Sequence, residues 1–369
     1  MKLRTWGPKD ITSGTRVFLR VDANIPVEHG RAKDGGVFGR ISQALPEIDA
    51  LRKRGAIIIL ASHLGDPGGK AKNDLSLAPV AKVFERRLQR TVSLVQNFDL
   101  PVLRPGELCM LENLRFDPGE EKNSDAFAWR LAKLANVYVN NAFGVCHRRH
   151  ASVHAITRHL PSFAGELVRR EVEELSAKPA KPFVLVMGGA KIATKIGLLE
   201  QLGPQADRIL LAGGVAVTFL AASEVALPAY PAALMQESDI ALARKLLRTF
   251  GRKIVLPTDL VAHPKLHIVA DIGPETREAF AHELHKAKTI IWNGPAGIIE
   301  RPDGKDGTLS LAQSMFESSA RVVTGGGETV EFLESHKMLK GFAHVSTGGG
   351  AMLAFLGGER LPGIEALRM

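Results

Sequence analysis

Four adjacent side chains that are cationic or can become cationic stand near the middle of the chain. His147, Arg148, Arg149 and His150 follow an apolar run, 137–139, and a turn of small residues. Two arginines at this place offer planar forks that match phosphate or carboxylate oxygens two at a time. The segment therefore favours an anion site, although a solvated basic loop explains it equally well when it is taken alone.

Glycines cluster at four places in the second half, each after an apolar run. The clusters are Gly188 and Gly189, Gly213 and Gly214, Gly325 to Gly327, and Gly348 to Gly350. Without a Cβ atom, backbone N–H groups can approach phosphate oxygens closely, and a following helix adds a partial positive charge. A single pair is better explained by tight packing of a strand against a helix, but four clusters favour a nucleotide. The chain has no GxxxxGK[ST] and no GxGxxG string, which disfavours P-loop and NAD enzymes.

Apolar, β-branched runs alternate with segments of helical period along the whole chain. This alternation predicts an α/β fold with parallel sheets built from βαβ units. In the first half we expect strands at 17–21, 57–61, 92–95, 108–111 and 137–139. In the second half the expected strands are PFVLVMGG, RILLAGG, KIVLPTD, TIIWNGP and RVVTGGG. Open α/β sheets bind ligands at the carboxyl ends of their strands, because the chain leaves the sheet there and the next helix presents its N-terminus.

Length and composition limit the classes of protein to which the chain can belong. A chain of 369 residues with 45% hydrophobic residues can form two sizeable cores, so we expect two domains. Cys109 and Cys146 have no CxxC spacing and suggest no disulfide framework, which fits a reducing cytoplasm. No apolar run approaches the roughly 18 residues that a membrane span needs, and the N-terminal residues lack a signal-peptide core. A soluble, cytoplasmic protein is predicted.

The net charge of +9 is concentrated in the first half. Residues 1–180 hold 28 Lys and Arg against 20 Asp and Glu, a net charge of +8, whereas residues 181–369 hold 20 against 19. A surface for nucleic acid is one interpretation, but the arginines fall one per strand end, and no zinc-finger or RNA-binding signature accompanies them. A small polyanion attracted into a cleft is the better partner.

Seven strand-end strings, together with the basic segment, point to one family. They are RVDANIP (20–26), SHLGDPGG (62–69), LENLRFDPGEEKN (111–123), GGAKIATK (188–195), WNGPAG (292–297), GGGET (325–329) and STGGGA (346–351). In this order they closely resemble phosphoglycerate kinase, which moves a phosphoryl group between 1,3-bisphosphoglycerate and ADP. The resemblance runs from about Arg16 to Leu367, and seven strings in register are very hard to obtain by chance.

The resemblance implies two Rossmann-like three-layer domains with parallel sheets, joined by a helix, with the active-site cleft between them. We expect a substrate domain at 1–164 with residues 360–369 packed back on it, an interdomain helix at 165–178 and a nucleotide-binding domain at 179–359. The charged segment GELVRREVEELSA is the candidate for that helix, and the following KPAKP would end it. A monomer is expected.

In the first domain the resemblance implies a phosphoglycerate site formed by Asp22, Asn24, Arg40, His63, Arg115 and Arg148. Asp22 and Asn24 would take the hydroxyl and carboxylate region of the substrate. His63, Arg115 and Arg148 would bind the phosphate end, and Arg40 would bind the acyl phosphate as a catalytic residue. A lone His63 is more often a satisfied, half-buried imidazole, but its SHLG context favours a ligand role.

In the second domain the resemblance implies a site for ATP or ADP with Mg²⁺. Lys191 and Lys195 would bind the nucleotide phosphates, and Lys191 would follow the transferred group as a catalytic residue, because an ammonium is a movable point charge. Glu300 would accept from the ribose hydroxyls, and Asn293 and Pro295 would line the phosphate and base sites. The remaining positions are Gly189, Gly213, Gly326, Gly327, Glu328 and Thr329, of which the last four would hold the β and γ phosphates with Mg²⁺, Glu328 being the metal ligand.

Several positions depart from the family's pattern. The usual SHLGRP has Arg where this chain has Asp66, which exchanges a phosphate-binding cation for an anion. Glu328 stands where Asp is usual and is one methylene longer. The other departures are Ala212 for Gly, Asn141 for Asp, Val145 and Cys146 for residues usually Thr and Ala, and the extra cation Arg149. Substrate identity is therefore less firmly implied than the reaction class.

The implied mechanism needs no general base, because the acceptor carboxylate is already ionised at neutral pH, with a pKa near 4. Catalysis then consists of aligning the acceptor with the γ-phosphate and neutralising the equatorial oxygens through Arg40, Lys191, Mg²⁺ and glycine N–H groups. Donor and acceptor would bind to different domains, which must close to exclude water. Two alternatives stay open: a related acyl-phosphate kinase or weakened homologue acting on another phospho-acid, and a basic nucleic-acid-binding protein.

Overall fold

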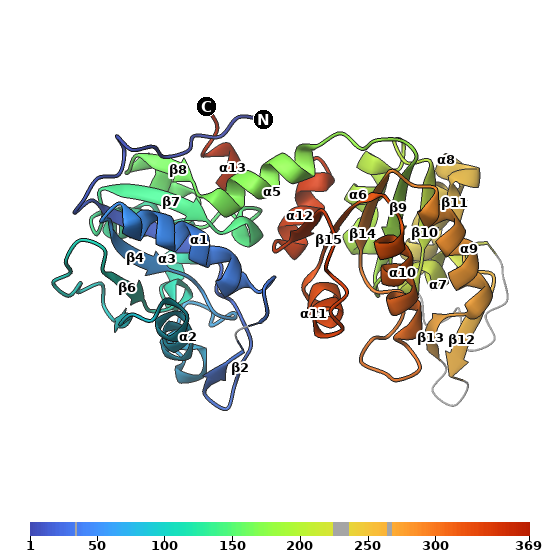
Figure 1. Ribbon diagram of the computed structural model, residues 1–369, viewed down its shortest axis with the longest axis horizontal. Helices are drawn as coiled ribbons and strands as arrows, with labels where there is room; N and C mark the ends of the chain where they lie inside the picture. Colours follow the sequence, from blue (N-terminus) through green and yellow to red (C-terminus); the bar gives the residue numbers. More distant parts are fainter. Residues whose placement is uncertain (34, 224–235, 264–267) are drawn as a thin grey trace. The chain divides into compact units, whose positions relative to one another are not determined.

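The protein, seen here as a computed structural model, is described for residues 1–33, 35–223, 236–263 and 268–369. It divides into two compact units (Figure 1). Unit 1 comprises Met1–Ser176 and Arg360–Met369, and unit 2 comprises Ala177–Glu359. Each unit is built around its own six-stranded sheet, so the apolar content of the chain is divided between two cores.

The sheet of unit 1 is parallel, with the strand order β5-β6-β4-β1-β7-β8. Its strands are β1 (Arg16–Val21), β4 (Ile57–Ala61), β5 (Ser93–Val95), β6 (Leu108–Leu111), β7 (Val137–Asn141) and β8 (Ser162–Ala164). The first five lie within two residues of the strands expected from the apolar runs. The edge strand β8 was not predicted, because its sequence SFA contains a single large apolar residue and so shows no apolar run.

Helices cover both faces of this sheet. The helices of unit 1 are α1 (Arg40–Lys53), α2 (Ala78–Leu88), α3 (Pro118–Glu121), α4 (Asp125–Ala132), α5 (Glu166–Ser176) and α13 (Pro362–Glu365), and a small hairpin joins β2 (Val27–Glu28) to β3 (Arg31–Ala32). On the face covered by α1 and α2 (Figure 1), Ile48 and Phe84 share a core with Leu19 of the central strand. Phe18 and Tyr138 alternate with such residues and face the other side, where their ring centroids lie 6.0 Å apart.

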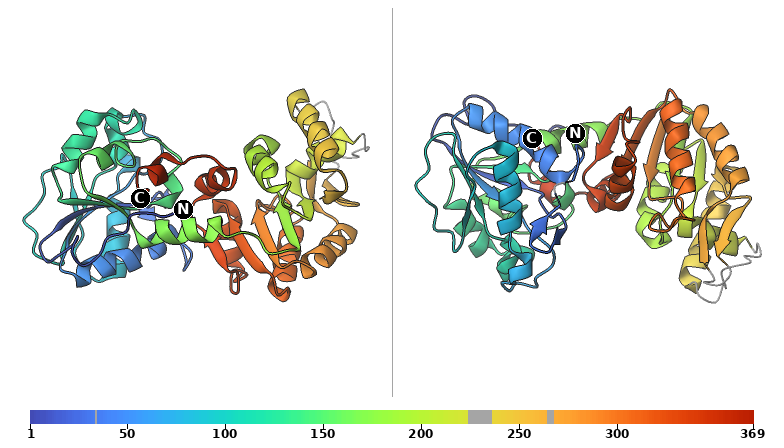
Figure 2. Two further views of the ribbon diagram at one scale, coloured as in Figure 1. Left: turned by 90° about the horizontal axis from the view of Figure 1, so that it is seen from above. Right: turned by 60° about the horizontal axis from the view of Figure 1, so that its bottom comes forward.

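The two ends of the chain lie side by side in unit 1 (Figure 2). Leu3 forms an antiparallel bridge with Arg368, and a guanidinium nitrogen of Arg4 donates to the carbonyl oxygen of Ala366 at 2.7 Å. The backbone N–H of Gly363 donates to the carbonyl oxygen of Cys146 at 3.0 Å. The C-terminal residues therefore brace the chain just before the basic segment 147–150.

The sheet of unit 2 is also parallel, with the order β11-β10-β9-β14-β15-β16. Its strands are β9 (Phe183–Met187), β10 (Arg208–Leu211), β11 (Ile254–Val255), β14 (Thr289–Asn293), β15 (Arg321–Gly325) and β16 (His344–Ser346). A separate antiparallel pair consists of β12 (Leu260–His263) and β13 (Ile268–Ile272). The five runs expected to form strands in this half correspond to β9, β10, β11, β14 and β15.

Helices connect these strands as βαβ units require. They are α6 (Ile196–Leu202), α7 (Gly213–Ala222), α8 (Glu237–Phe250), α9 (Pro274–His285), α10 (Asp306–Glu317), α11 (Gly327–Ser335) and α12 (Gly349–Leu356). The predicted fold class, α/β with a parallel sheet in each of two parts, is confirmed. In the part of the chain that the structure describes, no helix is both long and apolar enough to cross a membrane.

Candidate functional site

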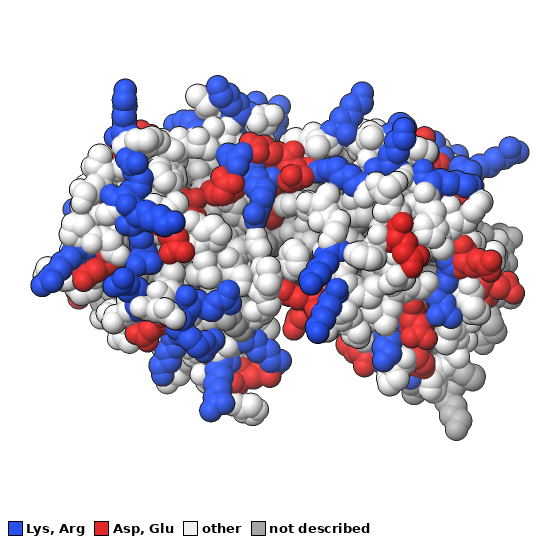
Figure 3. Space-filling model, in the orientation of Figure 1, with Lys and Arg blue, Asp and Glu red and all other residues white. Residues whose placement is uncertain are grey.

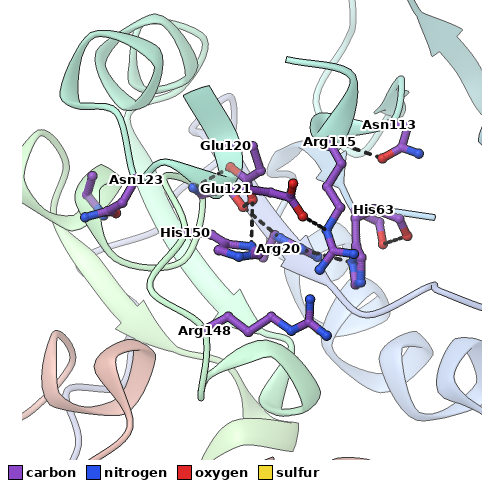
Figure 4. Close-up of polar contacts among 12 residues, drawn as sticks. Arg20, His63, Asn113, Arg115, Glu120, Glu121, Asn123, Arg148 and His150 are labelled. Carbon is purple, nitrogen blue, oxygen red and sulfur yellow. Dashed lines mark hydrogen bonds and ion pairs between the residues drawn. The ribbon is translucent and has the colours of Figure 1, made fainter. Parts of the chain in front are cut away.

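The carboxyl ends of four neighbouring strands carry the polar side chains of the candidate site in unit 1. Asp22 follows β1, His63 follows β4, Arg115 follows β6 and Arg148 follows β7. Because these strands are parallel and adjacent, their carboxyl ends meet at one edge of the sheet. Figure 4 shows Arg115, Arg148 and His63 directed toward the same region, together with Arg20. The sheet thus gathers cations that are far apart in the sequence.

Arg115 is a buried cation with open hydrogen-bonding capacity. Its side chain is 2% exposed, and Nη1 donates to the carbonyl oxygen of Gly65 at 2.8 Å and to the carboxylate of Asp66. Nε lies 3.5 Å from a carboxylate oxygen of Glu121, yet neither Nε nor Nη2 has a hydrogen-bond partner among the described residues. Burial and the nearby Arg148 lower the pKa of Arg115. An anion that accepts hydrogen bonds from these two nitrogens would satisfy the guanidinium.

Local hydrogen bonds fix the 3₁₀ turn, Leu114–Phe116, that carries Arg115. The side-chain oxygen of Asn113 accepts from the backbone N–H of Arg115 at 3.1 Å, a common bond from Asn to the backbone two residues on. The side-chain nitrogen of Asn113 donates to the carbonyl oxygens of Leu64 at 2.7 Å and Leu75 at 3.0 Å. The LENLRF string therefore holds its arginine in place and ties it to the SHLG strand end.

His63 is buried beside a second arginine that the sequence analysis did not assign. Nη2 of Arg20 lies 3.2 Å from Nδ1 of His63, and both side chains are almost fully buried. Burial, followed by the charges of Arg20 and Arg115, holds the pKa of His63 well below its ordinary value of 6.5. One signal in the sequence could have identified Arg20: it is a charged residue within the apolar run that follows Arg16 in the strand RVFLRV.

Asp22, Asn24 and Arg40 form a second group at the same edge. Nη1 of Arg40, the first residue of α1, lies 3.3 Å from a carboxylate oxygen of Asp22 and donates to the carbonyl oxygen of Asn24 at 2.6 Å. The side-chain oxygen of Asn24 accepts from the backbone N–H of Gly65 at 2.9 Å. The RVDANIP and SHLG strings are thus in direct contact. Arg148 is half-buried, and its Nε lies 3.4 Å from Nε2 of His147.

The departures around the basic segment have structural explanations. The side-chain oxygen of Asn141 accepts from the backbone N–H of Leu167 at 2.9 Å and so caps α5, while its side-chain nitrogen is buried without a hydrogen-bond partner among the described residues. Cys146 is fully buried, and burial raises the pKa of its thiol to about 12, which excludes a thiolate nucleophile at neutral pH. Arg149 is exposed.

The glycine clusters of unit 2 have two different roles. A Cβ atom on Gly188 would lie 2.1 Å from the carbonyl oxygen of Pro295, and one on Gly213 would lie 3.0 Å from the backbone of the first cluster. Close packing of backbones therefore requires glycine at these two positions. Gly327, at the start of α11, has no described atom within 4 Å of its Cβ position, and Gly326 before it has φ +118°. The open helix N-terminus at this third cluster suits a phosphate group.

Lys195 and Asn293 form the buried polar centre of the candidate site in unit 2. Nζ of Lys195 donates to the side-chain oxygen of Asn293, whose side-chain nitrogen donates to the carbonyl oxygen of Gly325 at 2.8 Å. These bonds join the strings GGAKIATK, WNGPAG and GGGET at the carboxyl ends of β9, β14 and β15. Burial lowers the pKa of Lys195 to about 8, although Glu328 acts in the opposite direction. A buried ammonium without a counter-ion raises the free energy of the folded state, and a bound anion lowers it again.

The buried ammonium gives a prediction for the dependence of stability on pH. The pKa of Lys195 is about 8 in the folded protein, against an ordinary 10.5, so between these values the unfolded chain keeps a proton that the folded chain has lost. The free energy of unfolding of the ligand-free wild type should therefore rise relative to that of Lys195→Met as the pH goes from 8 to 10, by up to about 1.4 kcal/mol per pH unit. Urea unfolding at several pH values measures this difference, and parallel curves for the two proteins would contradict the burial of the charge.

The remaining predicted residues of unit 2 lie along the same segments. The backbone N–H of Gly189 donates to the carbonyl oxygen of Pro295 at 2.8 Å, which ties the first cluster to the segment after β14. Lys191 is exposed and directly precedes the 3₁₀ turn Ile192–Lys195. Thr329 is buried in the first turn of α11, and Glu300 is exposed in the segment between β14 and α10.

Glu328 is the candidate metal ligand and is exposed in the first turn of α11. Within the described ranges, no group of three or more His, Cys, Asp or Glu side chains could hold a metal ion. Mg²⁺ commonly takes one or two protein carboxylates and completes its coordination with water and substrate phosphates. The residues present therefore fit a Mg²⁺ that is held jointly by Glu328 and a nucleotide, and that would neutralise charge on the phosphates.

Figure 3 shows Lys and Arg side chains over much of the visible surface of unit 1. This distribution agrees with the excess of +8 in residues 1–180. A positive surface attracts small anions toward the buried arginines and raises their association rate.

The chain matches one family over nearly its whole length. The model of the family described as phosphoglycerate kinase matches residues 9–359. The chain belongs to the phosphoglycerate kinase family. The phosphoglycerate kinase of Moorella thermoacetica is 41% identical over 382 residues, which covers 95% of this chain and 96% of that protein. The phosphoglycerate kinase of Desulforudis audaxviator is 43% identical over 386 residues, covering 96% and 97%.

Solved phosphoglycerate kinase structures share the fold as well. The structure from Coxiella burnetii aligns with a TM-score of 0.83 at 34% identity and covers 96% of each chain. The structure from Pyrococcus horikoshii OT3 aligns with a TM-score of 0.86 at 30% identity, again with 96% of each chain covered. The predicted family and enzyme class, a phosphoglycerate kinase, are confirmed, and a nucleic-acid-binding protein is not favoured.

Proposed function

We propose that this protein catalyses the reversible transfer of a phosphoryl group between 1,3-bisphosphoglycerate and ADP, giving 3-phosphoglycerate and ATP. The observation that carries the proposal is the buried guanidinium of Arg115, which has two nitrogens without a hydrogen-bond partner in the described structure and lies near Arg148 and His63. A phosphate group supplies the acceptors and the negative charge that this cluster of cations needs. Glycolysis and gluconeogenesis both use this reaction.

In unit 1, the proposal assigns the phosphate end of 3-phosphoglycerate to His63, Arg115 and Arg148. Asp22 and Asn24 would bind the hydroxyl and carboxylate region, since Asp22 follows β1 at the edge of the sheet and accepts from the backbone N–H of Asn24, which in turn contacts Gly65. Arg40 already lies between these two residues and would meet the acyl phosphate. No side chain is required as a general base, because the attacking carboxylate is ionised at neutral pH.

In unit 2, the proposal assigns ATP or ADP to the carboxyl ends of β9, β14 and β15. Lys195 would bind the phosphates from its buried position beside Asn293, and Lys191 would follow the transferred group. The glycine turn and first turn of α11, with Gly326, Gly327 and Thr329, would bind the terminal phosphates. Further residues assigned to the nucleotide are Gly189, Gly213, Pro295 and, for the ribose, Glu300. Mg²⁺ held in part by Glu328 would supply charge neutralisation.

We further propose that the enzyme works as a monomer in the cytoplasm on small molecules alone. Its two cysteines, Cys109 and Cys146, are both buried and free, as is usual for proteins of a reducing compartment. Neither a membrane nor a nucleic acid is required by any of the assigned residues.

A coupled assay with 3-phosphoglycerate, ATP and Mg²⁺ tests the reaction. Turnover that depends on all three components, and that Arg115→Met abolishes without unfolding the protein, would support it. The specific alternative is a kinase for another phospho-acid, because Asp66 places a carboxylate on Arg115. Turnover with a different acid at a higher kcat/KM than with 3-phosphoglycerate would favour that alternative.

Glu328→Asp is expected to shift metal preference toward Mg²⁺. The longer glutamate places its carboxylate one methylene further from the backbone of α11, and Mg²⁺ demands near-ideal octahedral geometry at about 2.1 Å, whereas Mn²⁺ is more forgiving. The ratio of kcat/KM with Mg²⁺ to that with Mn²⁺ should rise by about twofold or more. Glu331→Asp, one turn further along the same helix, is the matched control. An unchanged ratio for Glu328→Asp would place this carboxylate outside the metal's ligands.

A further inference from the structure

A chain of four buried polar side chains leads from the interior of unit 1 to the proposed phosphate site (Figure 4). Glu120 accepts from the hydroxyl of Ser152 at 2.5 Å, and the same hydroxyl lies 3.0 Å from Nε of Arg20. Nη2 of Arg20 lies 3.2 Å from Nδ1 of His63. All four side chains are at most 3% exposed. The general mechanism of phosphoryl transfer uses neither Glu120 nor Ser152.

The chemistry of arginine fixes the direction of the first two hydrogen bonds. A guanidinium can only donate, so the hydroxyl oxygen of Ser152 must accept from Nε of Arg20. The single hydroxyl hydrogen is then left for the carboxylate of Glu120. The second carboxylate oxygen of Glu120 accepts from the backbone N–H of Ser152 at 2.9 Å. Both oxygens of Glu120 therefore accept hydrogen bonds. Burial raises the pKa of Glu120, whereas the charge of Arg20 and the two hydrogen bonds from Ser152 oppose that rise and favour the ionised carboxylate.

The same argument fixes the state of the imidazole at the other end. Because Nη2 of Arg20 donates, Nδ1 of His63 must present its lone pair and carry no hydrogen. A neutral imidazole without a proton on Nδ1 carries it on Nε2. Nη1 of Arg20 donates to the carbonyl oxygen of Val21, so each of the three guanidinium nitrogens has a partner. Arg20 therefore cannot turn away from His63 without giving up several buried hydrogen bonds.

We propose that Glu120, Ser152 and Arg20 are positioning residues that hold His63 as the neutral tautomer with its proton on Nε2, so that it donates to a phosphate oxygen of the substrate. This inference rests on the proposed function only where it identifies the bound phosphate. The state of the imidazole follows from the hydrogen bonds alone. A fixed donor suits an anion that Arg115 and Arg148 neutralise, and it costs no rearrangement when the substrate arrives. It also excludes His63 as a proton acceptor from the substrate.

The surroundings of His63 keep this state over the physiological pH range. Arg20 from β1, Arg115 from the turn after β6, Arg40 from α1 and Arg148 from the segment after β7 all oppose a positive charge on the ring, and burial opposes it more strongly. A protonated ring would also place an N–H against a guanidinium N–H. The affinity for phosphate should therefore show no change caused by protonation of His63 between pH 6 and 8.

Nuclear magnetic resonance of the wild-type protein with ¹⁵N-labelled histidine tests the state directly, and the signal of His63 is assigned by its loss in His63→Gln. We expect Nδ1 to give the shift of an unprotonated ring nitrogen and Nε2 that of a protonated one, unchanged from pH 6 to 8. A proton on Nδ1, or a ring that titrates in this range, would overturn the proposal. Because this measurement needs neither substrate nor turnover, it is independent of the proposed reaction.

Ser152→Ala tests the link between Glu120 and Arg20, and Ser162→Ala is the matched control, since Ser162 is also buried in unit 1 but donates to the carbonyl oxygen of Leu160. In Ser152→Ala we expect a second tautomer of His63 to appear and the KM for 3-phosphoglycerate to rise about fivefold, with kcat changed less. The control should alter neither. Unchanged histidine shifts in a folded Ser152→Ala protein would overturn the role of the hydroxyl.

Glu120→Gln probes the charge at the far end of the chain. Its matched control is Glu47→Gln, another buried carboxylate of unit 1, which accepts from Nε1 of Trp6 at 2.7 Å and from the backbone N–H of Glu166 at 2.7 Å. Both variants should lower stability, but only Glu120→Gln should change the ¹⁵N shifts of His63. Equal effects of the two variants on His63 would show that Glu120 acts only on stability and would contradict its positioning role.

Discussion

Lys191→Ala is expected to lower kcat by about two orders of magnitude or more, while the Kd for ATP changes by less than about threefold. The two lysines of GGAKIATK differ in the structure. Lys195 is buried and bonded to Asn293, so it holds a fixed position, whereas Lys191 is exposed ahead of the turn. An exposed ammonium can follow the phosphoryl group and stabilise it more in transit than at rest.

The measurement combines steady-state kinetics with direct titration of ATP binding. Lys245→Ala is the control, because Lys245 is also an exposed lysine of unit 2, on α8, and is assigned no part in the site. It should leave both kcat and Kd near the wild-type values. If Lys191→Ala kept its kcat and lost only affinity for ATP, Lys191 would bind the resting nucleotide and another group would stabilise the transferred phosphoryl.

The parallel sheets could be predicted because their strands are buried on both faces and so appear as continuous apolar runs. PFVLVM and TIIWN are examples, and they form β9 and β14. The antiparallel pair β12 and β13 and the short β8 were not predicted. β8 reads SFA, with one large apolar residue, and β12 reads LVAH, with two, so neither shows an extended apolar run.

The sequence predicted which residues lie at the candidate site better than it predicted which of them contact one another. Strand ends and the family resemblance led to Arg115 and His63, which the sheet does bring to one edge. Arg20 was not assigned, because its partners Ser152 and Glu120 are more than 90 residues away in the sequence. The four glycine clusters together were taken to favour a nucleotide, with Gly213 among the assigned contacts, whereas Gly188 and Gly213 are required by backbone packing that only the folded chain reveals.

The contact between Asp66 and Arg115 could not be foreseen either, and it gives the second large prediction. Asp66→Arg is expected to lower the KM for 3-phosphoglycerate by about tenfold or more, with kcat affected less. The Asp66 carboxylate accepts from Nη1 of Arg115 and so occupies a donor that the phosphate would use. It also repels the phosphate, and because solvent screens so exposed a carboxylate, each effect costs up to about 1 kcal/mol. The side chain of Asp66 is 77% exposed, so a larger residue fits there.

Two further variants separate the local contact from the overall charge. Asp66→Asn removes the charge without adding a cation and should lower the KM by a smaller factor than Asp66→Arg. Asp99→Arg makes the same change in net charge at another exposed acid of unit 1 and should leave the KM nearly unchanged. Arg149 and Lys70, which is four residues after Asp66 in the sequence, are the two cations that could replace the missing arginine. Tight binding of 3-phosphoglycerate by the wild type that survives both Arg149→Ala and Lys70→Ala would mean that Asp66 does not weaken the site. If Asp66→Arg gained nothing and wild-type activity were negligible, the substrate would instead carry a hydroxyl or amine in place of the phosphate, because Asp66 could accept its hydrogen bond.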